Sequence, residues 1–231
     1  MTLISIITPV LNEEGTVRLF FDRLASLDGD FEVIVVDGGS SDTTPSLLNE
    51  CIRGFPALVT ILSTSPGRSI QMNAGAAVAR GEILLFLHVD CVIPSDSLRV
   101  IEEACTLPGV VGGAFLQSFV ESDRPEEVRR QVVNWLARRL QTFFGDFGIF
   151  VDQRIFVQSG RFSPIPYCED IEFCRAVRSY GRLVQIDRVI CSSPRRFERV
   201  GRSKLAAVYL LALGLNLLKI RSPFLKRLIV D

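Results

Sequence analysis

The sequence predicts an α/β protein with a mostly parallel central sheet flanked by helices, and three observations lead to this prediction. Short apolar runs alternate with longer segments of helical periodicity, which is the order of successive βαβ units. The run Glu82–Asp90 is apolar from Ile83 to Leu87, as in a central strand covered on both faces. The length of 231 residues, 48% of them hydrophobic, suits one large domain or a domain with an appendage.

The first half of the chain shows this alternation most clearly. Apolar residues recur at helical spacing after the first strand, and Pro45 stands where a proline starts a helix. The expected elements are strands at Leu3–Val10, Phe31–Val36, Leu58–Leu62 and Glu82–Asp90, with helices at Glu13–Leu27, from Pro45 onward and at Ile70–Arg80.

The second half has longer helices and a strand with two adjacent glycines. Gly112 and Gly113 indicate a bend or the close approach of another backbone. The expected elements are helices at Pro94–Cys105, Pro125–Phe144, Glu169–Tyr180 and Ser203–Ile220, strands at Val110–Val120 and Leu183–Ile190, and a turn at Gly145–Gly148. We expect the apolar stripe of the long amphipathic helix to lie in the core: Val128, Val132, Trp135, Leu136, Leu140 and Phe143.

Charge and cysteine content narrow the classes of protein. The 26 basic and 26 acidic residues give a formal net charge of zero, so no bulk electrostatic attraction to nucleic acid is expected. The six cysteines include no C-x-x-C pair, which indicates buried thiols in a reducing compartment rather than a zinc ribbon. Because Met1–Leu11 lacks a basic n-region, we expect no secretory signal and a cytoplasmic location, with membrane association left open.

Acidic residues stand at the ends of three expected strands. Glu13 follows the first strand, Asp37 ends the second and Asp90 ends the fourth. Parallel strands bring their carboxyl ends to one edge of a sheet, so these acids outline a pocket. Together with the amides of the turn at Gly38 and with Arg68, such a pocket suits a nucleotide with its phosphates. The dinucleotide fingerprint G-x-G-x-x-G and the P-loop motif are both absent.

Two polar positions allow both a chemical and a structural interpretation. The period-two spacing of His88 and Asp90 would point both side chains to one side of a strand, toward a metal or substrate, yet a strand ending in a polar turn explains them too. Glu169 and Asp170 open a helix after two prolines, where the helix dipole stabilises acids. An acid there that faces the pocket could instead act as a general base on a hydroxyl group.

These motifs together resemble the inverting family 2 glycosyltransferases, which have a GT-A fold. The similar pieces occur in the family's order over residues 3 to about 175, and Ser193–Glu198 resembles a segment of a short bacterial subgroup. They are Thr8–Glu13, Val35–Asp42, Gly67-Arg68 with Gln71, Asn73 and Gly75, Ala79–Glu82, Phe86–Asp90 and Cys168–Asp170.

The resemblance implies transfer of one sugar from a nucleotide-diphosphate sugar to an acceptor hydroxyl, with inversion. It implies a catalytic role for Asp170 as base with Glu169 beside it, and a metal role for Asp90 in holding a Mg or Mn ion. The residues implied to bind the nucleotide and donor are Pro9, Glu13, Asp37, Gly38, Arg68, Asn73 and His88. The acceptor implied is a saccharide, a lipid or a small molecule.

The chain departs from the family pattern at several positions. His88-Val89-Asp90 replaces Asp-x-Asp, and one carboxylate is a weaker site for a hard ion than two. Gly38 stands where many family members have a second acid. Phe147 follows Gly145-Asp146, at a position where the short bacterial subgroup has a glutamine. Because the Q-x-x-R-W motif of processive synthases is missing, we expect non-processive transfer. A nucleotidyltransferase on a related fold and a catalytically silent nucleotide-sugar-binding protein remain the alternatives.

The C-terminal region is expected to form an appendage, residues 201–231, to a catalytic domain of residues 1–200. The apolar run Leu205–Leu218 is, at fourteen residues, shorter than the roughly 20 residues that span a bilayer. The segment 203–220 could pack on the domain, form a homodimer or contact a membrane surface peripherally. The basic side chains before it could clamp a pyrophosphate or an anionic lipid, or be solvated: Arg195, Arg196, Arg199 and Arg202.

Overall fold

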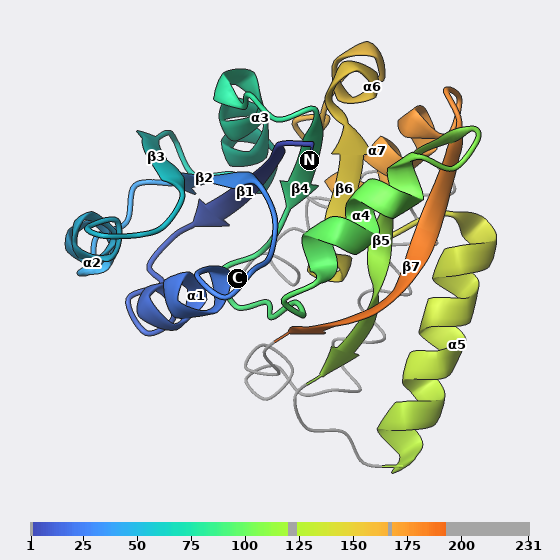
Figure 1. Cartoon of the computed structure of the whole chain (residues 1–231), viewed down its shortest axis with the longest axis horizontal. Coiled ribbons are helices and arrows are strands. Elements are labelled where there is room, and N and C mark those ends of the chain that lie inside the picture. Colours follow the sequence, from blue (N-terminus) through green and yellow to red (C-terminus); the bar gives the residue numbers. More distant parts are fainter. Residues whose placement is uncertain (1, 120–123, 166–167, 193–231) are drawn as a thin grey trace.

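The computed structural model describes residues 2–119, 124–165 and 168–192, and within them one seven-stranded sheet is the framework of the molecule (Figure 1). The strand order is β3-β2-β1-β4-β6-β5-β7, which places β4 in the centre. The strands are β1 Ile4–Val10, β2 Phe31–Asp37, β3 Leu58–Ser63, β4 Ile83–Phe86, β5 Val110–Phe119, β6 Ile149–Asp152 and β7 Arg182–Ser192.

The first four strands are parallel, as the alternating pattern predicts. β1 pairs with β2 and with β4, and β2 pairs with β3. Among the strands of the described residues, only β6 runs antiparallel, and it pairs with both β4 and β5. Because Phe86, the last residue of β4, lies opposite Ile149, the first of β6, the segment before β6 reaches the same edge of the sheet as the carboxyl ends of β1, β2 and β4.

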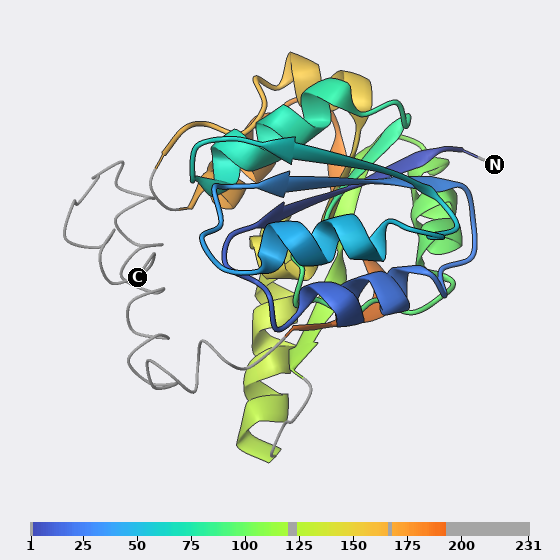
Figure 2. The same ribbon diagram turned by 90° about the vertical axis from the view of Figure 1, so that its left-hand side faces the viewer.

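Helices cover both faces of the sheet, with α3 on one side and α1 and α2 on the other (Figure 2). Two buried apolar clusters correspond to these two layers, one shared with α1, α2 and α4 and the other with α3, α6 and α7. The helices are α1 Val17–Leu24, α2 Thr44–Cys51, α3 Arg68–Val78, α4 Ser97–Cys105, α5 Arg124–Leu140, α6 Gln153–Gln158 and α7 Glu169–Val177, with a short 3-10 helix, η1, at Gly145–Phe147.

Close packing at glycines and phenylalanines sets the distance between these layers. A Cβ on Gly75 of α3 would lie 2.6 Å from Ile7 Cγ2, so only glycine lets α3 approach β1 this closely. On the same side of the sheet, Phe86 packs edge-on against Phe162 with ring centroids 4.8 Å apart, and Phe162 lies 4.3 Å from Phe173 of α7. The end of β4 and the middle of α7 are therefore held against one aromatic cluster.

Two expectations from the sequence are wrong in their extent. The first helix begins at Val17 rather than Glu13, because Asn12 takes a left-handed backbone conformation with φ 54° and the next residues form a turn. The central strand ends at Phe86, so residues 87–90 lie beyond it. The period-two argument for His88 and Asp90 therefore does not apply to them.

The expectation for the long amphipathic helix is also wrong. Val132, Trp135, Leu136 and Leu140 of α5 are exposed, and of the described stripe residues only Phe143, which follows the helix, is buried. The expected helix at 203–220 lies outside the described residues. In the described part of the chain, no helix combines the length and the apolar character needed to cross a membrane.

Candidate active site

The carboxyl ends of β2, β1 and β4 are neighbours, so the structure brings the predicted tip residues to one edge. Pro9 pairs with Val36, and Val10 pairs with Asp37. Asp37 is 8% exposed and accepts hydrogen bonds from the Ser40 backbone N–H at 3.0 Å and from its hydroxyl at 2.6 Å. These bonds fix the turn after β2.

The loops after β1 and β2 are tied to each other. The Ser41 N–H donates to Asn12 Oδ1 at 2.8 Å, and the Glu13 N–H donates to Thr44 Oγ1 at 2.8 Å. The Glu13 carboxylate accepts from the Thr16 hydroxyl at 2.5 Å. Glu13 and Asp37 therefore belong to one rigid rim, consistent with the pocket predicted from the strand tips.

Gln71 of α3 supports this rim through hydrogen bonds to the ends of β1 and β2. This role was not predicted from the sequence. Its side chain is 3% exposed, and its Nε2 donates to the carbonyls of Val10 at 2.9 Å and Val36 at 2.8 Å. A Cβ on Gly38 would lie 3.1 Å from the Gln71 amide, so Gly38 lets the turn rest on it. The buried amide satisfies carbonyls at the ends of β1 and β2 from the helix that carries Arg68.

We expect Gln71→Glu to raise the KM for the nucleotide sugar about tenfold, with a smaller change in kcat. The glutamate loses both N–H bonds to the Val10 and Val36 carbonyls, and the loosened rim then binds the nucleotide sugar less tightly in the ground state and in the transition state alike. Steady-state kinetics over a range of donor concentrations measures this. Gln153→Glu is the matched control. Gln153 Nε2 also donates to a backbone carbonyl, that of Ala79 at 2.9 Å, but Gln153 does not contact the ends of β1 and β2. Equal donor KM values for the two variants would contradict the assignment.

A cavity beside this rim collects the other predicted polar residues. Arg68, His88, Glu169 and Asp170 all line it, although they come from three separate parts of the chain. Its apolar wall is formed by Met72, Phe86, Ile149 and Phe162. The structure thus brings the expected catalytic acids together with one expected donor-binding arginine and the expected histidine.

Asp170 is held at the start of α7 with its carboxyl turned into the cavity. Oδ2 accepts from the Gly145 N–H at 2.8 Å, and Oδ1 accepts from the Ile171 N–H at 2.8 Å. Cys168, immediately before the helix, adopts a left-handed backbone with φ 60°, which is costly for a residue that is not glycine. The chain therefore turns sharply where the two acids enter the cavity.

The environment of Asp170 favours its protonated form. Burial of the carboxyl, followed by the charge of Glu169, raises the pKa of Asp170 from 3.8 to about 7, while the Gly145 and Ile171 N–H groups and the Arg68 guanidinium oppose the rise. A carboxylate with a pKa near neutrality is a suitable general base. Glu169 is 8% exposed and Asp170 beside it is half-buried, so Asp170 is poised to exchange a proton near neutral pH.

Gly145 lies between His88 and Asp170 in the cavity, in close contact with His88. A Cβ at this position would lie 2.9 Å from His88 Nε2 and 3.9 Å from Asp170 Oδ2. The His88 ring therefore lies against the backbone that also donates to Asp170. The sequence predicted only a turn here, and the position of its amide had no local signal.

Asp90, the predicted metal ligand, is not among the residues that line this cavity. Its carboxylate and that of Asp146, which follows Gly145, both help to raise the pKa of the buried Cys91 thiol, after the effect of burial itself. In the described ranges no three His, Cys, Asp or Glu side chains converge on a common point for a metal ion. A single carboxylate completed by substrate phosphate oxygens is nevertheless a set that Mg²⁺ uses.

Asn73 is placed differently from the other predicted donor-binding residues. Its side-chain Nδ2 donates to the Phe162 carbonyl at 2.8 Å, and its Oδ1 accepts from the Phe162 N–H at 3.1 Å. Asn73 thereby ties α3 to the loop that leads toward α7. The basic side chains predicted at Arg195, Arg196, Arg199 and Arg202 lie outside the described residues.

Comparison with known proteins places this geometry in context. A family model described as glycosyl transferase family 2 matches residues 5–162. An undecaprenyl-phosphate 4-deoxy-4-formamido-L-arabinose transferase from Aeromonas hydrophila is 28% identical over 117 residues, which are 48% of this chain and 36% of that protein. The match therefore spans about a third of that relative's length.

Two solved structures are similar in fold. A mannosyltransferase from Pyrobaculum calidifontis, in complex with GDP-Man and Mn²⁺, superposes with a TM-score of 0.66 at 21% identity, over 80% of this chain and 56% of that one. Residues 1–349 of S. aureus TarS, in complex with UDP-GlcNAc, give a TM-score of 0.62 at 18% identity, over 84% of this chain and 58% of that one. Both likenesses show a common GT-A fold.

Proposed function

This chain belongs to glycosyl transferase family 2, and from that premise we propose that it moves one sugar from a nucleotide-diphosphate sugar to an acceptor hydroxyl with inversion. The observation that carries the proposal is the cavity in which Asp170, with its pKa raised to about 7, meets Arg68. A base that exchanges protons near neutrality, close to a cation that can face a diphosphate, suits glycosyl transfer. We assign this activity to residues 1–200, with 201–231 as an appendage.

Asp170 is the general base of the proposed reaction. Its carboxylate takes the proton from the acceptor hydroxyl as the oxygen forms a bond to the anomeric carbon of the donor sugar. The bond from that carbon to the diphosphate oxygen breaks, and its electron pair leaves with the nucleoside diphosphate. Attack from the face opposite the leaving group inverts the anomeric centre, and the proton remains on Asp170 until solvent removes it.

The rim at the ends of β1 and β2 binds the nucleotide in this proposal. Pro9, Glu13, Asp37 and Gly38 are supported by their position at one edge of the sheet, where open α/β sheets bind ligands. Arg68 stands between this rim and Asp170, since it lies one helical turn before Gln71 and lines the Asp170 cavity. We assign it to the donor diphosphate, for which a guanidinium is a suitable partner.

A divalent ion is part of the proposal through Asp90. The ion would be held by the Asp90 carboxylate with diphosphate oxygens of the donor, and when bound it supplies positive charge to the leaving group. His88 is assigned to the donor side, because its ring lies against Gly145 in the cavity. The presence of Mn²⁺ in the mannosyltransferase complex supports an ion in this fold.

We expect turnover to release a nucleoside diphosphate and no pyrophosphate. Purified protein is incubated with UDP and GDP sugars and a panel of saccharide and lipid acceptors, and nucleotide products are separated by ion-exchange chromatography. A nucleotidyltransferase on a related fold would release pyrophosphate instead, which contradicts the proposal. Binding of a nucleotide sugar by calorimetry without any turnover would indicate a silent binding protein.

The same assay separates the metal assignment from the transfer assignment. If Asp90 holds a divalent ion, a chelator abolishes release of the nucleoside diphosphate and Mn²⁺ or Mg²⁺ restores it, while Asp90→Asn requires a higher metal concentration. Transfer that continues unchanged in the chelator would refute the metal role of Asp90 and leave the role of Asp170 intact.

A further inference from the structure

Helix α5 is packed on the sheet by its polar side. Asn134 is 6% exposed, and its amide exchanges two hydrogen bonds of 3.0 Å with the Gln117 backbone in β5. Asn134 Oδ1 also accepts from Gln185 Nε2 of β7 at 2.8 Å. Ala137, one turn along the same face, is 7% exposed. The inner face of the described part of α5 is thus small and polar.

The outer face of α5 carries the large apolar side chains. Val132, Leu136 and Leu140 recur every four residues and are 51%, 42% and 53% exposed, so they form one continuous row along the helix. Trp135 flanks this row and is 58% exposed. A surface helix normally buries its apolar stripe, and a continuous exposed stripe of this kind marks an interaction site. We call these four side chains the α5 outer face.

Most charged residues of α5 are cationic: the helix contains five arginines, and Glu126 and Glu127 lie in its first turn. Arg138 and Arg139 are exposed in the last turn of the helix, and the Arg139 guanidinium lies 6.0 Å from the centre of the Trp135 ring. Arg178 adds a third cation, because its guanidinium donates to the Leu140 carbonyl at the helix end. Between residues 130 and 140 the sequence contains no Asp or Glu. The face is therefore apolar with a cationic border.

The position of α5 makes this face accessible. α5 stands at the outer edge of the molecule beyond β7 in Figure 1, and it projects past the sheet in Figure 2. A second copy of the chain packed on the same face would offer only Glu126 and Glu127 of its α5 to the five arginines of this helix, which leaves a net positive charge on both sides of the contact. An anionic lipid surface, in contrast, complements both the apolar row and its cations.

We propose that the α5 outer face docks the protein onto a bilayer surface that contains anionic lipid. The apolar row enters the boundary between headgroups and acyl chains, Trp135 lies at the level of the headgroups, and the arginines contact lipid phosphates. Lysine and arginine side chains near such a surface contribute roughly 1 kcal/mol each, so the contact weakens as salt is raised. This site consists of residues of α5 and does not include residues 203–220, and it does not depend on the glycosyl transfer proposed above.

Trp135 is the only tryptophan of the chain, so its fluorescence reports on this face alone. The full chain is titrated with vesicles of phosphatidylcholine, with or without phosphatidylglycerol, at low and high salt. We expect a blue shift of the emission and reduced quenching by acrylamide only with the anionic vesicles. A blue shift that develops with protein concentration in the absence of vesicles would mean that a second copy covers the face, and would overturn the proposal.

Variants that retain Trp135 test the face by vesicle sedimentation. Leu136→Gln with Leu140→Gln, and separately Arg138→Gln with Arg139→Gln, should each lower the partition coefficient about tenfold. Leu19→Gln with Leu58→Gln is the matched control, because both leucines are 49% exposed on other elements. Sedimentation that is equal in all variants, binding without a change in Trp135 emission, or no binding at all would each refute docking through α5.

Discussion

Asp170→Asn is expected to lower the rate of sugar transfer by at least about 100-fold, because a carboxamide cannot accept the acceptor proton. The replacement keeps the shape of the side chain and an oxygen that can accept from the Gly145 N–H. Binding of the nucleotide donor should therefore stay near the wild-type value. Single-turnover transfer rates and calorimetric donor binding measure the two effects separately.

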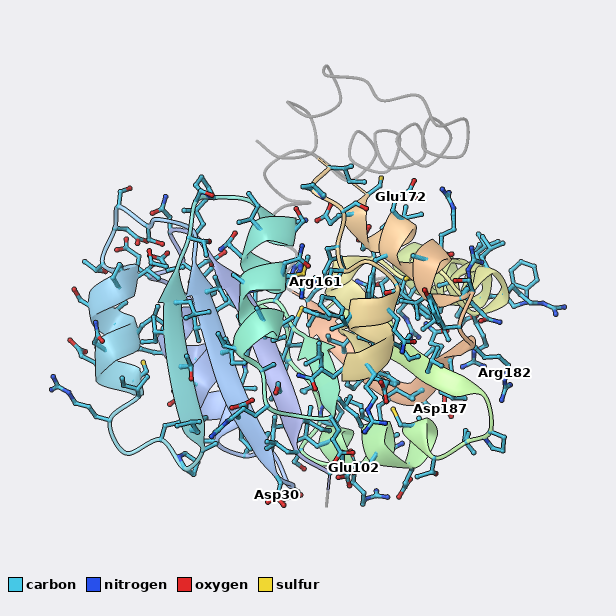
Figure 3. All side chains as sticks on the ribbon, turned by 90° about the horizontal axis from the view of Figure 1, so that it is seen from above. Asp30, Glu102, Arg161, Glu172, Arg182 and Asp187 are labelled. Carbon is cyan, nitrogen blue, oxygen red and sulfur yellow. The ribbon has the colours of Figure 1, made fainter. Side chains whose placement is uncertain are left out.

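Glu172→Gln is the matched control for this variant. Glu172 is also in the first turn of α7, but its carboxylate pairs with Arg175 at 3.0 Å. The Glu172 side chain, labelled on α7 in Figure 3, is 29% exposed. The control should transfer sugar at nearly the wild-type rate. If Asp170→Asn retains full activity, another group must be the base.

The rate of transfer is expected to rise with pH up to about 7 and then to level off. Only the ionised form of Asp170 accepts a proton, and its pKa is raised to about 7 by burial and by Glu169. At pH 5 about 1% of the carboxyl is ionised, so the rate should increase roughly 100-fold between pH 5 and a pH well above 7. The pH dependence of kcat/KM measures the pKa in the free enzyme.

The same raised pKa predicts that the stability of the folded protein falls as the pH rises, whereas the rate of transfer increases. Because the folded-state pKa of Asp170 lies above its ordinary value of 3.8, the folded protein binds more protons than the unfolded chain between about pH 4 and pH 7. The contribution of Asp170 to the free energy of unfolding is therefore fully present below pH 4 and is lost as the pH rises through 7. Asp170→Asn removes this loss, so the variant should melt at a higher temperature than the wild type at pH 8.

Matched thermal melts at pH 5 and pH 8 check this prediction. The difference in Tm between the variant and the wild type should be larger at pH 8, where the wild-type carboxylate is ionised in the cavity. A rate that is independent of pH between 5 and 7, or a Tm difference that is equal at both pH values, would show that the pKa of Asp170 is not raised.

Much of the fold could be predicted because its signals are local. The apolar runs of β1 to β4 and the helices between them are each readable within a short window of sequence. That Pro9 and Asp37 lie at the same edge of the sheet could be predicted from the parallel pairing of β1 and β2 alone. The lengths of α1 and β4 were less predictable, because the bonds that tie the loop at Asn12 to Ser41, and the pairing of β4 with β6, are contacts between distant segments.

The candidate site was only partly predictable. The pairing of Glu169 and Asp170 is visible in the sequence, and the structure adds that they share a cavity with Arg68 and His88. Gln71 had a weak signal, since a glutamine on the inner side of a small-residue helix is unusual and needs buried partners. The roles assigned to these residues remain predictions for the experiments above.

The sequence by itself determined the α/β class, the parallel edge with its acids and the pair of acids at the start of α7, since each depends on periodicity or on neighbours in the chain. Only the tertiary structure decided that the Gly145 amide holds Asp170, a contact across 25 residues, and that α5 turns its apolar row outward. Periodicity tells which side chains share a face of a helix. Which face is buried depends on the hydrogen bonds offered by the surface beneath, and here Gln117 and Gln185 select the side of α5 that bears Asn134.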